Sequence, residues 1–157
     1  MSSAQFSTLS EHGRLILGSG TAVVGGSPTR VRNSSKISLE VLGSITAAKN
    51  YADTLVNLKH FEESKSLMLK MIPVARRALG EGHRLTLKMR LNYAQTLFAD
   101  TAATLDDLRE AVSTLEDTTR TARQVFGGAH PLSVSIGKAL RQSRALLRAR
   151  ETPSTSA

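Results

Sequence analysis

The chain has 157 residues, of which 40% are hydrophobic and only 4% aromatic, and its formal net charge is +8. This length suits one domain. The absence of cysteine excludes disulfides, thiolate metal sites and cysteine nucleophiles. No apolar run approaches the roughly 18 residues of a membrane span, so we expect a cytoplasmic protein without membrane insertion. The basic charge is compatible with acidic peptides, nucleic acid or anionic surfaces, and does not decide among them.

The two ends of the chain differ in composition from its middle. Residues 1–36 are rich in Ser, Gly and Thr, which predicts a flexible or disordered lead. A weak resemblance to an organelle transit peptide is the alternative for this segment. Residues 152–157 form a small polar tail that we also expect to be disordered. The domain should therefore occupy residues 37–151.

Apolar residues recur at three- and four-residue steps through the domain, which predicts five helices. Their expected bounds are about 38–58, 61–79, 85–99, 105–126 and 131–150. Gly80 should end the second helix in the left-handed αL conformation, and Thr104 with Asp107 forms a capping pair for the fourth. Pro131 suits the first turn of the last helix, whereas Pro73 should bend the second. The expected inward residues are Leu42, Ile45, Tyr51, Ala52, Leu55, Leu67, Met71, Val74, Ala78, Leu105, Leu108, Val112, Leu115, Ala122, Phe126, Leu132, Ile136, Ala139, Leu140 and Leu147.

Two segments of the domain repeat. The sequence NYADTL at residues 50–55 returns as NYAQTL at residues 92–97, an offset of 42. The segment 78–83 returns at 125–130 with an offset of 47, and each copy ends in histidine. Such a period predicts an all-α, short right-handed superhelical stack of antiparallel helical hairpins, with about two repeats and a capping helix. Tyr51 and Tyr93 should then have equivalent surroundings.

Residues 50–83 resemble one tetratricopeptide unit of the kinesin light chain type. The resemblance is carried by Asn50-Tyr51-Ala52-x-x-Leu55, by Phe61-Glu62-Glu63-Ser64-x-x-Leu67 and by Leu79-Gly80-Glu81-x-His83. A second unit over residues 92–131 matches at fewer positions. Lys59 departs from the family pattern because it stands where a turn glycine is usual.

The resemblance implies that Asn50 and Asn92 face a concave groove and bond the backbone of a bound peptide. An amide can both donate and accept hydrogen bonds, so it suits an extended backbone. The alternative is a solvated helix face or an interhelix hydrogen bond. The expected groove residues are Lys49, Asn50, Asp53, Asn57, Lys88, Asn92 and Gln95.

A second candidate surface is a basic stripe on the last helix, formed by Lys138, Arg141, Arg144 and Arg148. It could hold phosphates in a salt-dependent manner, but no aromatic residue interleaves for base stacking. The solvated side of a terminal helix explains it equally well. His83 and His130 should cap or brace the linkers, because no metal-ligand spacing accompanies them.

No nucleophile–base pair and no nucleotide-binding loop occur in the sequence, so we expect neither an enzyme nor a cofactor. The predicted function is a non-catalytic interaction module for a protein or peptide, with an acidic peptide as one candidate ligand. Two alternatives remain. One is a structural or self-associating fragment of a longer repeat array, and the other is nucleic-acid binding through the last helix.

Overall fold

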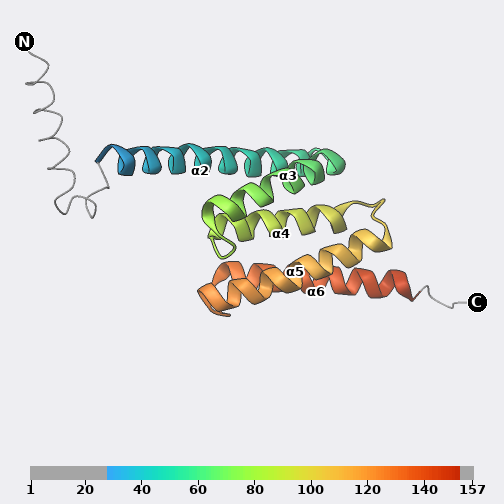
Figure 1. The fold of residues 1–157 in the computed structure, drawn as a ribbon. Coiled ribbons are helices and arrows are strands. Elements are labelled where there is room, and N and C mark those ends of the chain that lie inside the picture. Colours follow the sequence, from blue (N-terminus) through green and yellow to red (C-terminus); the bar gives the residue numbers. More distant parts are fainter. Residues whose placement is uncertain (1–27, 153–157) are drawn as a thin grey trace, which may run out of the picture. The chain divides into compact units, whose positions relative to one another are not determined.

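The computed structural model of the protein describes residues 28–152, with side chains from residue 39 onward. This part of the chain is all α-helical and contains no strand, as expected (Figure 1). The helices are α2 (Pro28–Asn57), α3 (Phe61–Leu79), α4 (Arg84–Ala99), α5 (Leu105–Phe126) and α6 (Pro131–Glu151).

The bounds of α3 to α6 lie within one residue of the predicted ones, but α2 begins ten residues earlier than predicted. Proline is well tolerated in a first helical turn, and residues 29–42 contain neither Gly nor Pro to interrupt the helix. Residues 28–36, which we expected in a flexible lead, are therefore helical. Residues 1–27 and 153–157 lie outside the described residues, so the predictions for them stay predictions.

The chain divides into two compact units, residues 1–40 and 41–157. In the second unit α3 packs on α4, α4 on α5, and α5 on α6, while α4 also contacts α6. Figure 1 shows the chain reversing at each connection between these helices. Leucine, isoleucine, alanine and methionine side chains fill the core, with Tyr93 among them.

The connections after α3 and α5 have the same backbone geometry. Gly80 has φ 93° and ψ 161°, and Gly127 has φ 82° and ψ 161°. Each donates its N–H to a carbonyl four residues back, Arg76 or Arg123, at 3.0 Å. The positive φ favours glycine, as expected. The αL prediction for Gly80 was wrong, because its ψ is extended.

The two histidines that follow these glycines also match. His83 Nδ1 accepts from the Leu85 N–H, and His130 Nδ1 accepts from the Leu132 N–H, both at 3.1 Å. Each histidine is thus the N-cap of the next helix, which confirms the predicted bracing role.

The predicted capping pair of α5 is confirmed as a full capping box. The Asp107 N–H donates to Thr104 Oγ1 at 3.1 Å, and the Thr104 N–H donates to Asp107 Oδ2 at 2.9 Å. Two backbone donors that the helix cannot satisfy itself are therefore paired.

Lys59 ends α2 with φ +62°, the sign of φ that a turn glycine would accommodate best. The His60 N–H bonds the Leu55 carbonyl at 2.8 Å and the Lys59 N–H bonds the Val56 carbonyl at 2.9 Å. This pair of bonds defines a Schellman ending, in which the residue at the Lys59 position is usually glycine. Lys59 therefore places a side chain at a position where glycine would have the lowest conformational strain.

Four residues predicted to face inward are exposed: Tyr51, Val74, Ala78 and Leu105. On α3 the buried stripe passes through Ser64, Met68 and Ala75 instead. Leu105 is the first residue of α5, where only one side of the helix is packed.

Tyr51 is 57% exposed whereas Tyr93 is 4% exposed, so the prediction of equivalent surroundings was wrong. The reason lies in the neighbours of their helices. Helix α4 lies between α3 and α5 in the packing order, whereas α2 comes first among the described helices. The face of α2 that carries Tyr51 therefore has no described helix over it.

Candidate functional site

Helices α2, α4 and α6 can be compared position by position with the offsets of 42 and 47 residues. Helix α4 has two buried stripes of side chains. We name them the preceding stripe and the following stripe, for the helices that come before and after α4 in the chain. The preceding stripe is Thr86, Met89, Tyr93 and Thr96. The following stripe is Leu87, Leu91, Ala94 and Leu97.

In α2 and in α6, only one of the two equivalent stripes is covered by other helices. In α2 the preceding-stripe positions are all exposed: Ser44, Ala47, Tyr51 and Thr54. Its following-stripe positions are buried or half-buried: Ile45, Lys49, Ala52 and Leu55. In α6 the preceding-stripe positions are buried: Ser133, Ile136, Leu140 and Ser143. Its following-stripe positions are exposed: Val134, Lys138, Arg141 and Arg144. Each of these two helices thus has a face that no described helix covers.

Three of the predicted groove residues meet in one polar network between α2 and α4. Lys49 Nζ lies 2.5 Å from Asp53 Oδ2, and the Asn92 side-chain amide donates to Asp53 Oδ1. For Asn92 the interhelix hydrogen bond, left open by the sequence, is therefore present. The network ties the two helices together across a 39-residue separation.

The remaining groove candidates are not drawn into this network. Asn50, Asn57 and Gln95 are exposed, and their side chains have no hydrogen-bond partner among the described residues. Lys88 is half-buried. A strip of free amides thus runs beside the Lys49–Asp53–Asn92 network, on the first helices of the two repeats.

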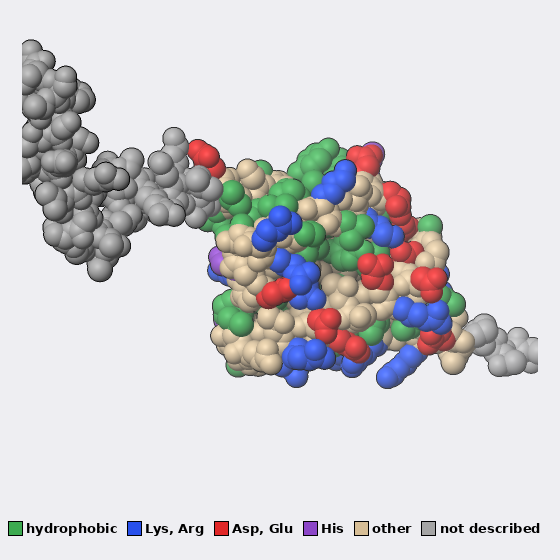
Figure 2. Space-filling view, viewed as in Figure 1, with side chains coloured by type: hydrophobic (Ala, Val, Ile, Leu, Met, Phe, Trp, Pro, Cys, Tyr) green, Lys and Arg blue, Asp and Glu red, His purple; other side chains and the backbone are tan. Residues whose placement is uncertain are grey.

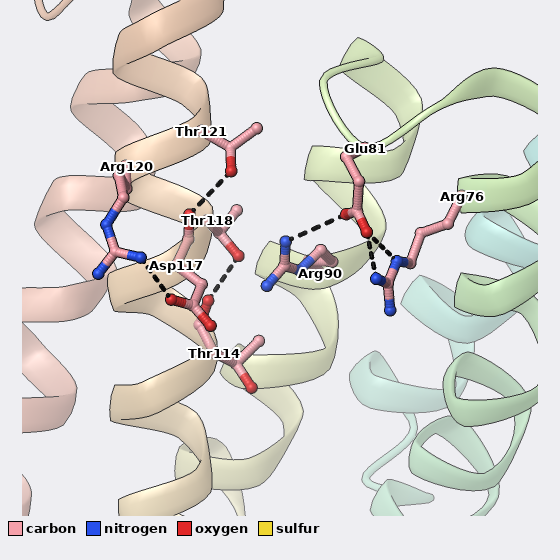
Figure 3. A network of polar contacts seen from close by, with 8 residues as sticks. All are labelled: Arg76, Glu81, Arg90, Thr114, Asp117, Thr118, Arg120 and Thr121. Carbon is pink, nitrogen blue, oxygen red and sulfur yellow. Dashed lines mark hydrogen bonds and ion pairs between the residues drawn. The ribbon is translucent and has the colours of Figure 1, made fainter.

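A second polar network braces the connection between α3 and α4 (Figure 3). The Glu81 carboxylate, in the linker, bonds the guanidinium of Arg76 on α3. Its other oxygen lies 3.5 Å from Arg90 Nη1 on α4. One carboxylate therefore forms ion pairs with two arginines.

The connection between α5 and α6 lacks both the carboxylate and the second arginine. At an offset of 47, the counterpart of Arg76 is Arg123, that of Glu81 is Gly128, and that of Arg90 is Gly137. Arg123 consequently has no carboxylate partner among the described side chains. Two glycines stand where side chains fill the space in the first repeat.

A cleft of about 700 Å³ opens between the bodies of α5 and α6, where Arg123 and Gly137 are part of its lining. Seven polar side chains line it: Arg120, Arg123, Arg141, Arg144, Glu116, Thr119 and Gln124. Figure 2 shows basic side chains gathered along the lower edge of the molecule, where α5 and α6 lie. We call this feature the arginine cleft.

Two of the four arginines in the arginine cleft are neutralised within the chain. Arg144 Nη2 lies 2.5 Å from Glu116 Oε1, and Arg120 Nη1 lies 3.2 Å from Asp117 Oδ1 (Figure 3). Arg123 and Arg141 form no ion pair among the described side chains. The Thr119 hydroxyl is buried beside them without a hydrogen-bond partner.

The four residues of the predicted basic stripe therefore do not all belong to one site. Lys138, Arg141, Arg144 and Arg148 are all exposed on α6, but only Arg141 and Arg144 line the arginine cleft. Arg150, which continues the stripe in sequence, instead donates to the Ala103 carbonyl at 2.8 Å. Sequence reasoning missed the contribution of Arg120 and Arg123, although the 47-residue offset already aligned Gly128 and Gly137 with charged residues.

The strongest pKa shifts belong to contacts between helices. Lys65 Nζ on α3 lies 2.7 Å from Asp107 Oδ1 on α5. Hydrogen bonds from Lys65 and Thr104 lower the pKa of Asp107 to about 2, and the bond with Asp107 raises the pKa of Lys65. Burial, followed by a hydrogen bond to Glu110 at 2.5 Å, raises the pKa of Tyr93. These groups join α3, α4 and α5. Lys65 and Asp107 line one small cavity of about 10 Å³, and Tyr93 is not part of its lining.

Within residues 39–152 no group of three or more His, Asp or Glu side chains is arranged to hold a metal ion. None of the helices described is both long enough and apolar enough to cross a membrane. Comparison of the chain with protein families, with curated proteins and with solved structures gives no match.

Proposed function

We propose that this protein is a non-catalytic interaction module of the tetratricopeptide type. The supporting observation is the burial pattern of the three equivalent helices. Helix α4 is covered on both stripes, whereas α2 and α6 are each covered on one, as expected for successive members of a stack. The matching geometry at Gly80–His83 and Gly127–His130 supports the same repeat. The cysteine-free composition is compatible with the cytoplasm, which we propose as its compartment.

The proposed peptide site is the polar strip on the first helices of the two repeats. Asn50, Asn57 and Gln95 offer amides that can pair with any peptide backbone, and they require no rearrangement because their side chains make no hydrogen bond among the described residues. The Lys49–Asp53–Asn92 network would hold the strip rigid, which lowers the entropy cost of binding.

Selection from a random peptide library on the wild-type chain tests this proposal. The selected peptides are then titrated against the double variant Asn50→Ala/Gln95→Ala, with Lys70→Ala on the exposed side of α3 as the control. We expect a loss of roughly tenfold in affinity for the double variant, since two hydrogen bonds are removed. Equal affinity of the strip variant and the control would refute the strip as the binding site.

A second candidate function is assembly of the chain with itself or with further repeats. The observation that favours it is the exposed face of α2 around Tyr51, whose counterpart on α4 is buried under a neighbouring helix. Sedimentation over a range of concentrations tests this alternative. This alternative would be contradicted if the wild type stays monomeric at every concentration and Tyr51→Ser sediments in the same way.

A further inference from the structure

The two helix–helix connections of this protein differ in one chemical respect. In the first, Glu81 forms ion pairs with Arg76 and Arg90. In the second, the equivalent arginine, Arg123, lines a cleft together with Gly137, the counterpart of Arg90, and Gly128 stands at the position of Glu81. The second connection therefore has the arginine of this ion pair but no carboxylate to pair with it.

Arg141 adds a second cation at the same place. Its counterpart on α4 is Ala94, which is fully buried, and the counterpart of Arg144 is the buried Leu97. The stripe of α4 that packs on a following helix is apolar, whereas the same stripe of α6 is basic. A helix that covered α6 in the manner in which α5 covers α4 would thus have to bring acidic side chains.

We propose that the arginine cleft binds an acidic amphipathic helix of a partner protein. Carboxylates of that helix pair with Arg123 and Arg141, in the role that Glu81 has in the first connection. Thr119 also lines the cleft, but its hydroxyl oxygen is buried, so the arginines make the polar contacts with the ligand. The apolar side of the incoming helix covers Leu140 and the backbone at Gly137 in the cleft.

The fold itself contains a precedent for an acidic helix on a preceding helix pair. Helix α5 packs on α4, and its first two turns reach the preceding pair through two carboxylates. Asp107 pairs with Lys65 on α3, and Glu110 accepts a hydrogen bond from Tyr93 on α4. An incoming helix at the arginine cleft would repeat this mode of docking one step further along.

Charge favours an acidic helix over two other possible partners, a second copy of the chain and a nucleic acid. A second copy of the chain brings a net charge of +8 to a surface that is itself basic, so repulsion opposes self-association there. A nucleic acid would meet Glu116 inside the cleft and would find no aromatic side chain on which a base could stack. An acidic helix also faces Glu116, which is paired with Arg144, but it brings the opposite charge to Arg123 and Arg141 and needs no stacking surface.

Fluorescence titration with two synthetic helical peptides of about 20 residues tests the proposal. Both peptides carry leucines at three- and four-residue spacing, one with flanking glutamates and the other with glutamines at the same positions. The protein variants are Arg123→Gln/Arg141→Gln and Gly128→Glu. The matched control is Arg77→Gln/Arg84→Gln, which removes the same charge from exposed positions outside the cleft.

The glutamate peptide should bind the wild type at least about tenfold more tightly than the glutamine peptide, because charge-assisted hydrogen bonds are lost in the latter. Arg123→Gln/Arg141→Gln should weaken binding by at least about tenfold, and the control by less than about threefold. Gly128→Glu should weaken it similarly, because it supplies the missing carboxylate within the chain. No atom lies within 4 Å of a Cβ built at Gly128, so the fold accommodates the change.

The proposal is overturned if the cleft variant and the control lose affinity equally, since the attraction is then only the overall charge. It is also overturned if wild-type dimers form and are lost in the cleft variant, or if a single-stranded oligonucleotide binds the cleft more tightly than the glutamate peptide. Should Gly128→Glu fail to fold, the arginine double variant alone decides the outcome. Asn50→Ala/Gln95→Ala leaves peptide binding at the cleft unchanged, so failure of the groove proposal is distinguishable.

Discussion

Asp107→Ala should destabilise the protein far more than the same change at its neighbour, Asp106. Asp107 completes the capping box of α5 and pairs with Lys65 on α3, and the two side chains are 21% and 25% exposed. Loss of its part in the cap costs about 1 kcal/mol, and loss of the partly screened ion pair costs about 0.5–1 kcal/mol. Asp106 is 91% exposed and pairs only within its own helix, so its removal costs about 0.5 kcal/mol.

Urea unfolding of both variants, followed by circular dichroism, measures this difference. We expect Asp107→Ala to lower the free energy of unfolding by about 1–1.5 kcal/mol more than Asp106→Ala. Equal costs for the two variants would refute the reasoning, because both share the helix-dipole contribution and only Asp107 has the cap and the contact with Lys65, whereas Asp106 has just its exposed pair with Arg109.

The same contact predicts a pH dependence with a defined sign. The pKa of Asp107 falls from an ordinary 3.8 to about 2 in the folded chain. A lowered pKa stabilises the fold above the unfolded value, and this stabilisation is lost as the pH falls from about 4 through 2. The difference in stability between wild type and Asp107→Ala should shrink by about 1 kcal/mol over this window, after allowance for solvent screening. A constant difference across the window would contradict the assigned shift.

Three further substitutions have expected outcomes in thermal or urea unfolding. Lys59→Gly should stabilise by about 0.5–1 kcal/mol relative to Lys59→Ala, because positive φ is strained for any residue with a Cβ; equal stability would argue against this backbone conformation. Gly137→Ala should stabilise α6 by up to about 1 kcal/mol, since the nearest atom to the added Cβ is the end of a flexible arginine at 3.8 Å; destabilisation would show that the site is tighter. His130→Ala should cost about 0.5–1 kcal/mol more than His83→Ala, because His130 also stacks on Phe126 at a ring separation of 4.7 Å; equal costs would assign no energy to the stack.

Helix identity and the linker geometry could be predicted from sequence because their causes are local. Three- and four-residue spacing of apolar residues gave the bounds of α3 to α6, and the recurrence of glycine three residues before histidine indicated two equivalent turns. The Thr104–Asp107 capping box depends on two side chains three residues apart, so it too could be foreseen.

The errors concern features that depend on neighbours. Tyr51 and Tyr93 lie in repeated segments that differ at one residue of six, and the helices packed around them make one exposed and the other buried. The spacing on α6 predicted a basic stripe, of which only Arg141 and Arg144 line the arginine cleft. Its concentration into a cleft depends on α5, because Arg120 and Arg123 come from that helix, and on Gly137, whose small size leaves the space open.

Thiol labelling of single-cysteine variants tests the central claim most directly, because the chain contains no cysteine of its own. Thr54, Thr96 and Ser143 are equivalent positions on the preceding stripe, and Ala52, Ala94 and Arg141 are equivalent positions on the following stripe. If α2, α4 and α6 are successive members of one stack, cysteines at 54 and 141 should react rapidly. Those at 52, 94, 96 and 143 should react only through rare opening of the fold. Similar reactivity at 54 and 96, or at 94 and 141, would contradict the stacking of equivalent helices on which the proposed function rests.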